Sequence, residues 1–307
     1  LGCETDGASS VSGFVLVYED DIHNTITRHI IYPTPSGWFV SGPSNLWSDS
    51  LLGASYHTPA ISRRAGTDHD FLVVAQKSPG LFGSYEIVAR VVDSLGNLVS
   101  GTATLVSSPN NDLAHPAVDG SGERFVAAWE RLSSGSPSAV EVAPLHWTAA
   151  TTILTMGNVI TFGGGLFVRT SAPTVCYGST RTWLGFQQVN LLPSPTTTLR
   201  LAAINPLTCV SCNDQFVVSN PSGPHIIAVR PYGPAGSNPA ASPIALCVFD
   251  DSINDITGQM VTDYGTTGTV TSLGGGCGSS GTTGGGLGLP TIGSLYRDQR
   301  AFLPATT

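Results

Sequence analysis

The six-residue apolar segment FVLVYE at residues 14–19 recurs along the chain and decides the fold. Its further copies are FLVVAQ at 71–76, FVAAWE at 125–130, WLGFQQ at 183–188 and ALCVFD at 245–250. A nearly continuous apolar run of this length predicts a strand that is covered on both faces by neighbouring layers. We therefore expect one structural unit, repeated five times.

Prolines give the period of the repeat. Pro59, Pro116 and Pro173 follow one another at intervals of 57 residues, and Pro224 comes 51 residues after Pro173. A period of this size indicates a repeat architecture. The five units are expected to begin near residues 2, 59, 116, 173 and 224.

Every unit shows the pattern of four short strands. A segment after the proline precedes the apolar word, a strand rich in β-branched residues follows, and a short fourth strand ends the unit. The expected third strands are ITRHIIY (26–32), YEIVARVV (85–92), AVEVAPLH (139–146), LRLAAIN (199–205) and ITGQMVT (256–262). The pattern predicts an all-β fold, a five-bladed β-propeller of four-stranded blades over residues 1–273. The alternative is an open array of small β-sandwiches, but these units are much shorter than the roughly 100 residues of an independent sandwich.

Several of these segments also resemble a known kind of repeat. They are similar to bacterial secreted β-propeller repeats of the form PAVA…FLVVWE…GRVVD, which occur in large surface and exported proteins. The resemblance covers roughly residues 2–273 and implies an extracellular or cell-surface setting; it carries no catalytic residues. It rests on Pro59, Pro116, Pro173 and the stretches 71–76, 125–130 and 87–96.

Residues 274–307 differ in composition from the repeats. Glycine dominates the first half of this segment, and ordering glycine is entropically costly, so a neighbouring surface must hold it. We expect a docking arm that binds an adjacent copy of the chain; folding back on its own propeller is the alternative. The apolar residues expected to make this contact are Leu287, Leu289, Ile292, Leu295, Tyr296, Phe302 and Leu303.

Overall composition limits the partners. The net charge of −8 argues against nucleic-acid binding, which needs a basic surface. No run of 18 apolar residues is present, so the sequence predicts no membrane span. The 6 cysteines in a chain with only 11% charged residues favour an oxidising, extracellular setting. The start at Leu1 without a signal peptide is what a processed secreted protein would show.

Cysteine positions suggest three disulfides. A bond between Cys3 and Cys277 would join the first unit to the last, and closing so long a loop is worth roughly 4–5 kcal/mol in the chain-entropy model. Two nearby cysteines in the sequence CVSC favour a local bridge over a redox pair or half of a metal site. The remaining pair lies in adjacent units. The second and third candidate pairs are Cys209 with Cys212 and Cys176 with Cys247.

Histidines and acidic residues are the remaining candidates for a functional site. His57, His115 and His225 lie beside the repeat proline, but their offsets from it differ, so structural roles are favoured over a metal ring. No metal site and no cofactor is predicted. Glycoside hydrolysis needs two carboxylates, and the candidates are Glu4, Asp119, Glu130 and Asp250. Because Glu19, Glu130 and Asp250 occupy equivalent repeat positions, the repeat explains them more simply than catalysis does.

The sequence thus favours a secreted structural or adhesive protein, not an enzyme, that self-assembles through its arm, for example into an extracellular filament. The first alternative is a carbohydrate-binding lectin with one pocket per blade. The tryptophans Trp38, Trp47, Trp147 and Trp183 do not align between units, which disfavours it. The second alternative is a glycoside hydrolase.

Overall fold

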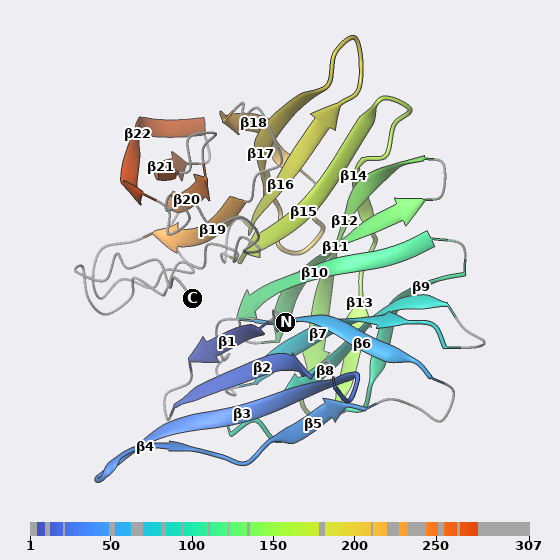
Figure 1. Cartoon of the computed structure of the whole chain (residues 1–307), viewed down its shortest axis with the longest axis vertical. Coiled ribbons are helices and arrows are strands. Elements are labelled where there is room, and N and C mark those ends of the chain that lie inside the picture. Colours follow the sequence, from blue (N-terminus) through green and yellow to red (C-terminus); the bar gives the residue numbers. More distant parts are fainter. Residues whose placement is uncertain are drawn as a thin grey trace. The chain divides into compact units, whose positions relative to one another are not determined.

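The fold is described from a computed structural model (Figure 1). The structure describes residues 5–9, 13–20, 22–48, 53–62, 70–80, 84–93, 95–109, 111–121, 123–133, 136–177, 182–209, 211–219, 227–232, 244–250, 255–262 and 265–275. Side chains are described for most of these residues from 13 to 209, but not for residues 5–9, 121, 133, 136 and 137.

All the described secondary structure is β, and it forms consecutive antiparallel sheets. In the part of the chain that the structure describes there are five such sheets, called here the first to the fifth in chain order. No helix among the described residues is long and apolar enough to cross a membrane. The prediction of an all-β fold is confirmed.

The first three sheets contain the following strands. The first sheet has the order β1 (Thr5–Ser9), β2 (Phe14–Asp20), β3 (Thr25–Thr34) and β4 (Gly37–Val40), with β5 (Ser44–Trp47) also paired to β3. The second has β6 (Ser55–Ile61), β7 (Phe71–Ser78), β8 (Tyr85–Val92) and β9 (Ala103–Ser108). The third has β10 (Asn111–Ser121), β11 (Arg124–Ser133), β12 (Ser136–Thr148) and β13 (Ile153–Met156), with β14 (Ile160–Gly163) also paired to β12.

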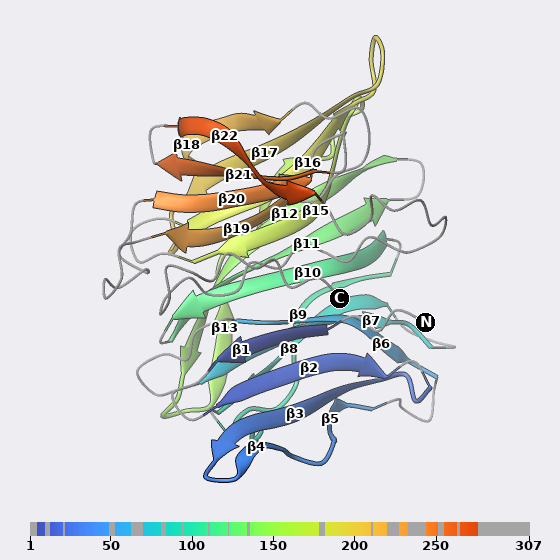
Figure 2. The same ribbon diagram turned by 60° about the vertical axis from the view of Figure 1, so that its left-hand side comes forward.

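The last two sheets each have four strands in sequence order. The fourth contains β15 (Val168–Cys176), β16 (Thr182–Asn190), β17 (Thr196–Ile204) and β18 (Ser211–Ser219). The fifth contains β19 (Ile227–Tyr232), β20 (Ile244–Asp250), β21 (Asp255–Thr262) and β22 (Gly265–Gly275). Figure 2 shows these last four as successive neighbours.

The recurring apolar word forms the second strand of every sheet, as predicted: β2, β7, β11, β16 and β20. In β7 the word is buried on both faces. Phe71, Val73 and Ala75 pack in one hydrophobic cluster with residues of the first sheet. Leu72 and Val74 point the other way, into a cluster with residues of the third sheet. A strand between two neighbouring sheets has no solvent-facing side, which explains why the word does not alternate.

The chain divides into two compact units. One comprises Leu1–Ser136 with Glu141–Ile160, and the other Pro137–Val140 with Thr161–Thr307. The first unit holds the first three sheets, apart from short pieces of β12 and β14, and the second holds the last two. The arm residues Leu287 to Leu303 and the pair Cys3 and Cys277 lie outside the described residues.

Candidate functional site

A β-bulge recurs on the first strand of the second, third and fourth sheets, at the repeat proline. The pairing of each strand with its neighbour skips the proline and the residue before it. Proline has no N–H to give to the ladder, so a bulge accommodates it there. The register breaks lie between His57 and Ala60 in β6, between Ala114 and Ala117 in β10, and between Ser171 and Thr174 in β15.

The residue before each of these prolines has a left-handed backbone. The φ angles are 48° at Thr58, 47° at His115 and 51° at Ala172. For a residue other than glycine this conformation costs roughly 1–2 kcal/mol. The same strained geometry therefore appears in three successive blade-like sheets and belongs to the repeat.

Next to each bulge the second strand places a polar side chain. Gln76, Glu130 and Gln187 stand at this position in the three sheets. The Thr58 hydroxyl donates to Gln76 Oε1 over 3.4 Å, and His115 Nδ1 lies 3.1 Å from Glu130 Oε2. These contacts join the polar end of the apolar word to the bulged strand.

Glu19 ends the word in the first sheet, but its contacts are with the second. One carboxylate oxygen accepts the backbone N–H of Thr58 over 3.0 Å, and the other lies 2.6 Å from His57 Nδ1. The Glu19 side chain is 12% exposed and the His57 ring 31% exposed. The pair is therefore mostly buried, with the histidine still reached by solvent.

Ser55 completes this arrangement from the start of β6. Its Oγ lies 2.7 Å from His57 Nε2. An ionised carboxylate only accepts hydrogen bonds, so Glu19 requires the proton on His57 Nδ1. In the neutral ring Nε2 is then the acceptor, and Ser55 donates to it. A hydroxyl, a base and a carboxylate that orients the base is an arrangement that can activate a nucleophile.

Two acid candidates of the third sheet are both buried but lie far apart. Asp119 pairs with Val126 in β10 and β11, and Glu130 stands four residues further along β11. At about 3.4 Å per residue this is roughly 14 Å, more than the 9.5 Å or so that a glycosidase carboxylate pair can span. Glu4 and the side chains of Asp250 and His225 lie outside the described residues.

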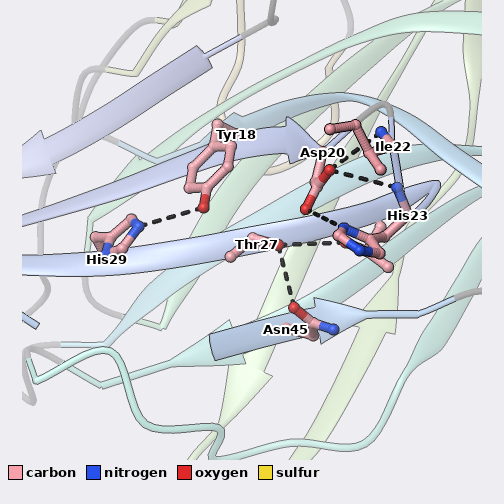
Figure 3. A network of polar contacts seen from close by, with 8 residues as sticks. Tyr18, Asp20, Ile22, His23, Thr27, His29 and Asn45 are labelled. Atoms are coloured by element: carbon pink, nitrogen blue, oxygen red, sulfur yellow. Dashed lines mark hydrogen bonds and ion pairs between the residues drawn. The ribbon is translucent and has the colours of Figure 1, made fainter. Parts of the chain in front are cut away.

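A second polar network lies next to Glu19, at the turn between β2 and β3 (Figure 3). Asp20 Oδ1 accepts the backbone N–H groups of Ile22 and His23, and Oδ2 lies 2.7 Å from His23 Nδ1. The hydrogen bond from His23 lowers the pKa of Asp20. This network closes a turn at the surface, and within the described chain no three His, Cys, Asp or Glu side chains gather as a metal site would require.

The described cysteine side chains are buried. Cys209 is a thiol that forms no disulfide, and burial raises its pKa to about 12. Its proposed partner Cys212 lies in β18, and Cys247, the proposed partner of the buried Cys176, lies in β20. The side chains of both strands are outside the described part. The pairings of Cys3 with Cys277 and of Cys176 with Cys247 stay predictions, whereas Cys209 is a thiol in this structure.

The hairpin of β3 and β4 exposes aromatic side chains. Trp38 is 72% exposed and Phe39 47%. Phe39 packs against Tyr32 with ring centroids 4.9 Å apart. Trp47, Trp147 and Trp183 are buried instead, which explains why the tryptophans do not align in the repeat: only Trp38 of these four faces solvent.

No protein-family model and no curated protein matches the sequence. Solved structures match over most of its length. The chain is similar to an α-L-arabinanase of Penicillium chrysogenum complexed with arabinobiose, with a TM-score of 0.55, 11% identity, and coverage of 88% of this chain and 80% of the other. It also matches the Aleuria aurantia lectin in complex with α-methyl-L-fucoside, with a TM-score of 0.49, 12% identity and coverage of 88% and 78%. The arabinanase likeness and the succession of four- and five-stranded sheets show a β-propeller.

Two predictions are contradicted by these comparisons. The expected function, a self-assembling structural or filament protein, is wrong, and so is the expectation that the chain is not an enzyme. The finding that overturns both is the likeness to the α-L-arabinanase, which is an enzyme and matches 88% of this chain with a TM-score of 0.55. Neither the repeat nor the lack of a catalytic motif excludes an enzyme, because one fold can carry different activities.

Proposed function

We propose that the protein is a carbohydrate-active hydrolase that cleaves glycosidic bonds. Support comes from the β-propeller fold that it shares with an α-L-arabinanase. The observation that carries the proposal is that two mostly buried carboxylates, Glu19 in the first sheet and Glu130 in the third, stand at equivalent repeat positions and each contact a histidine on a bulged strand. Hydrolysis of a glycosidic bond requires two such carboxylates.

The two carboxylates have different surroundings, which fits different roles. Glu19 accepts hydrogen bonds on both oxygens, from Thr58 and His57, as an ionised carboxylate does. Glu130 has one oxygen beside His115, whose side chain is 58% exposed. In this proposal Glu130 is the acid that protonates the leaving oxygen, and Glu19 is the negative charge that stabilises the sugar cation.

The test is the release of reducing ends from arabinan and a panel of other unesterified plant and microbial polysaccharides. The native chain is expected to act on at least one of them, and Glu130→Gln should lower kcat by about 10²–10⁴-fold. Glu123→Gln is the matched control, because Glu123 lies in the turn before β11 with its side chain 46% exposed. Inactivity of the native chain on the whole panel, or full activity of Glu130→Gln, would refute the proposal.

A second candidate function is carbohydrate binding without hydrolysis, favoured by the exposed β3–β4 hairpin. Flat aromatic faces that meet solvent mark binding surfaces, and Trp38 presents the largest one. Trp38→Ala is then expected to weaken glycan binding about tenfold or more in calorimetry, whereas Ile22→Ala, at a residue 85% exposed elsewhere in the first sheet, should not. Equal binding by both variants would argue against the hairpin.

We propose further that the propeller has five blades and works outside the cell. The blade number is supported by the five described sheets and by the spacing of the repeat prolines. The extracellular setting is supported by the resemblance to secreted repeats and by the low content of charged residues. Secretion is tested by fractionating the cells that make the protein and measuring whether it leaves with the medium.

A further inference from the structure

We propose that the protein has a second hydrolytic activity, the cleavage of carboxylic esters, with Ser55 as nucleophile, His57 as general base and Glu19 as the positioning carboxylate. The distances are 2.7 Å from Ser55 Oγ to His57 Nε2 and 2.6 Å from His57 Nδ1 to Glu19 Oε1. Both are within the range that proton transfer requires.

The strand fixes the serine and the histidine on one face. Ser55 and His57 are two residues apart in β6, and side chains at this spacing point to the same side. Tyr56 lies between them and packs the opposite way, with its ring 6.1 Å from that of Trp47. The packing of Tyr56 therefore holds the nucleophile and its base in register.

Glu19 is held from a different sheet. The bulge gives Thr58 its left-handed backbone and presents its N–H to Glu19 Oε2, so the carboxylate has one oxygen fixed before it meets the imidazole. A carboxylate anchored in this way sets both the tautomer and the orientation of the ring. The half-exposed face of His57 leaves room for a substrate to approach.

The repeat does not explain the serine–histidine pair. The bulge register aligns His57 with Ala114 and Ser171, the residues that pair with Glu130 and Gln187. Two residues earlier, Ser55 aligns with Asp112 in β10 and Arg169 in β15. Polar residues that arise from the repeat should recur, and this pair does not. The second sheet has thus acquired it separately.

The reaction is balanced with water as the only co-reactant. Ser55 Oγ attacks the ester carbonyl carbon while its proton passes to His57 Nε2. The tetrahedral intermediate expels the alcohol, which takes that proton, and leaves the acyl group on Ser55. Water then attacks the acyl carbon and gives a proton to His57, which returns it to the Ser55 oxygen as the acid leaves. β6 is the edge strand of its sheet, so alternate backbone N–H groups on its outer edge can bind the developing oxyanion.

Covalent labelling tests the nucleophile without reference to any natural substrate. The full chain is treated with a fluorophosphonate, and the modified residue is identified by peptide mass spectrometry. We expect phosphonylation at Ser55, lost in Ser55→Ala and reduced by about 10²-fold or more in rate in His57→Gln. The controls are Ser36→Ala, at an exposed turn serine bonded to Thr34, and His23→Gln, which removes a histidine–carboxylate pair that lacks a serine. Labelling at any other residue, or none at Ser55, overturns the proposal.

Kinetics with p-nitrophenyl acetate test the positioning residue. Glu19→Gln is expected to lower kcat by about 10²–10⁴-fold with little change in KM, because the imidazole loses its orientation while the ester still binds. Each variant is first compared with the native chain by circular dichroism and thermal unfolding. Unchanged hydrolysis in a folded Ser55→Ala variant overturns the proposal. The aryl ester has no glycosidic bond and the polysaccharides have no ester, so either proposed activity can fail while the other stands.

Discussion

Two buried indole N–H groups are satisfied by acidic side chains. Trp147 Nε1 donates to Asp70 Oδ2 over 2.9 Å, and Trp129 Nε1 to Glu141 Oε2 over 2.8 Å. Asp70→Ala leaves a buried donor without this acceptor, so we expect a loss of about 1–3 kcal/mol in unfolding free energy. Urea unfolding followed by tryptophan fluorescence measures it. Asp70→Asn keeps an acceptor and should lose less; equal losses would show that the hydrogen bond is not the cause.

The Cys209 thiol predicts a dependence on pH. Its pKa is raised from 9.0 to about 12 by burial. An unfolded chain releases this proton near pH 9 and the folded chain does not, so stability should fall as the pH rises from about 9 towards 12. At pH 8 the native thiol should resist iodoacetamide and react fully in urea, as peptide mass spectrometry would report. Rapid alkylation of Cys209 in the native chain would contradict this.

The sequence shows part of the candidate site at this scale. Ser55 and His57 stand two residues apart, and this spacing already predicts a shared face on a strand. The contact of His57 with Glu19 spans 38 positions and two sheets, and no local pattern indicates it. His57, His115 and His225 are recognisable in the sequence by their place beside the repeat proline. The sequence does not show that the first two contact glutamates, Glu19 and Glu130.

Among the elements, the bulged first strand makes a testable demand on the backbone. Ala172 has a φ of 51°, a region where glycine is unstrained and β-branched residues are disfavoured. Ala172→Gly is expected to be neutral or to stabilise by up to about 1 kcal/mol, and Ala172→Val to destabilise by about 1 kcal/mol or more. Thermal unfolding of the two variants gives the comparison. A Val variant as stable as the Gly variant would contradict the strained geometry.

The strand positions are largely predictable because the apolar words recur at nearly constant spacing, and in β7 the word is buried on both faces. The third-strand segment 85–92 coincides with β8. In the fourth sheet the segment equivalent to the other apolar words begins one residue earlier than predicted. Gln187, not Gln188, pairs with the residue just before the bulge, so the equivalent segment is 182–187. The bulges themselves and the additional strands β5 and β14 depend on pairing between strands, which a single-sequence pattern does not encode.

On the scale of the whole molecule, the sheets of the first unit depend on one another. Removing residues 1–54 deletes β1 to β5 and uncovers the face of β7 that carries Phe71, Val73 and Ala75. A chain that starts at residue 55 should therefore aggregate or bind the dye ANS strongly, as an exposed apolar sheet face does. Size-exclusion chromatography and dye fluorescence test this. A well-folded monomer with no dye binding would show that the sheets are independent.

The repeat in the sequence predicts the fold but not the activity. Prolines 57 residues apart and the recurring words predict stacked small sheets, and the structure confirms an all-β propeller. The same fold supports different activities, so architecture alone does not decide among them. The wrong prediction of function depended on an arm expected to be ordered at 274–307 and on the lack of a recognisable catalytic motif.

The recurring bulge has a consequence for how such a molecule can change. The second, third and fourth sheets share the bulge, its left-handed residue and a polar side chain beside it. The two positions that precede the bulge on one face of the strand differ between them: Ser55 with His57, Asp112 with Ala114, and Arg169 with Ser171. Two substitutions at these positions can therefore add or remove functional side chains in one sheet while the bulges of the other sheets preserve the fold. Because the unit is repeated, equivalent positions can diverge in one sheet without loss of the fold.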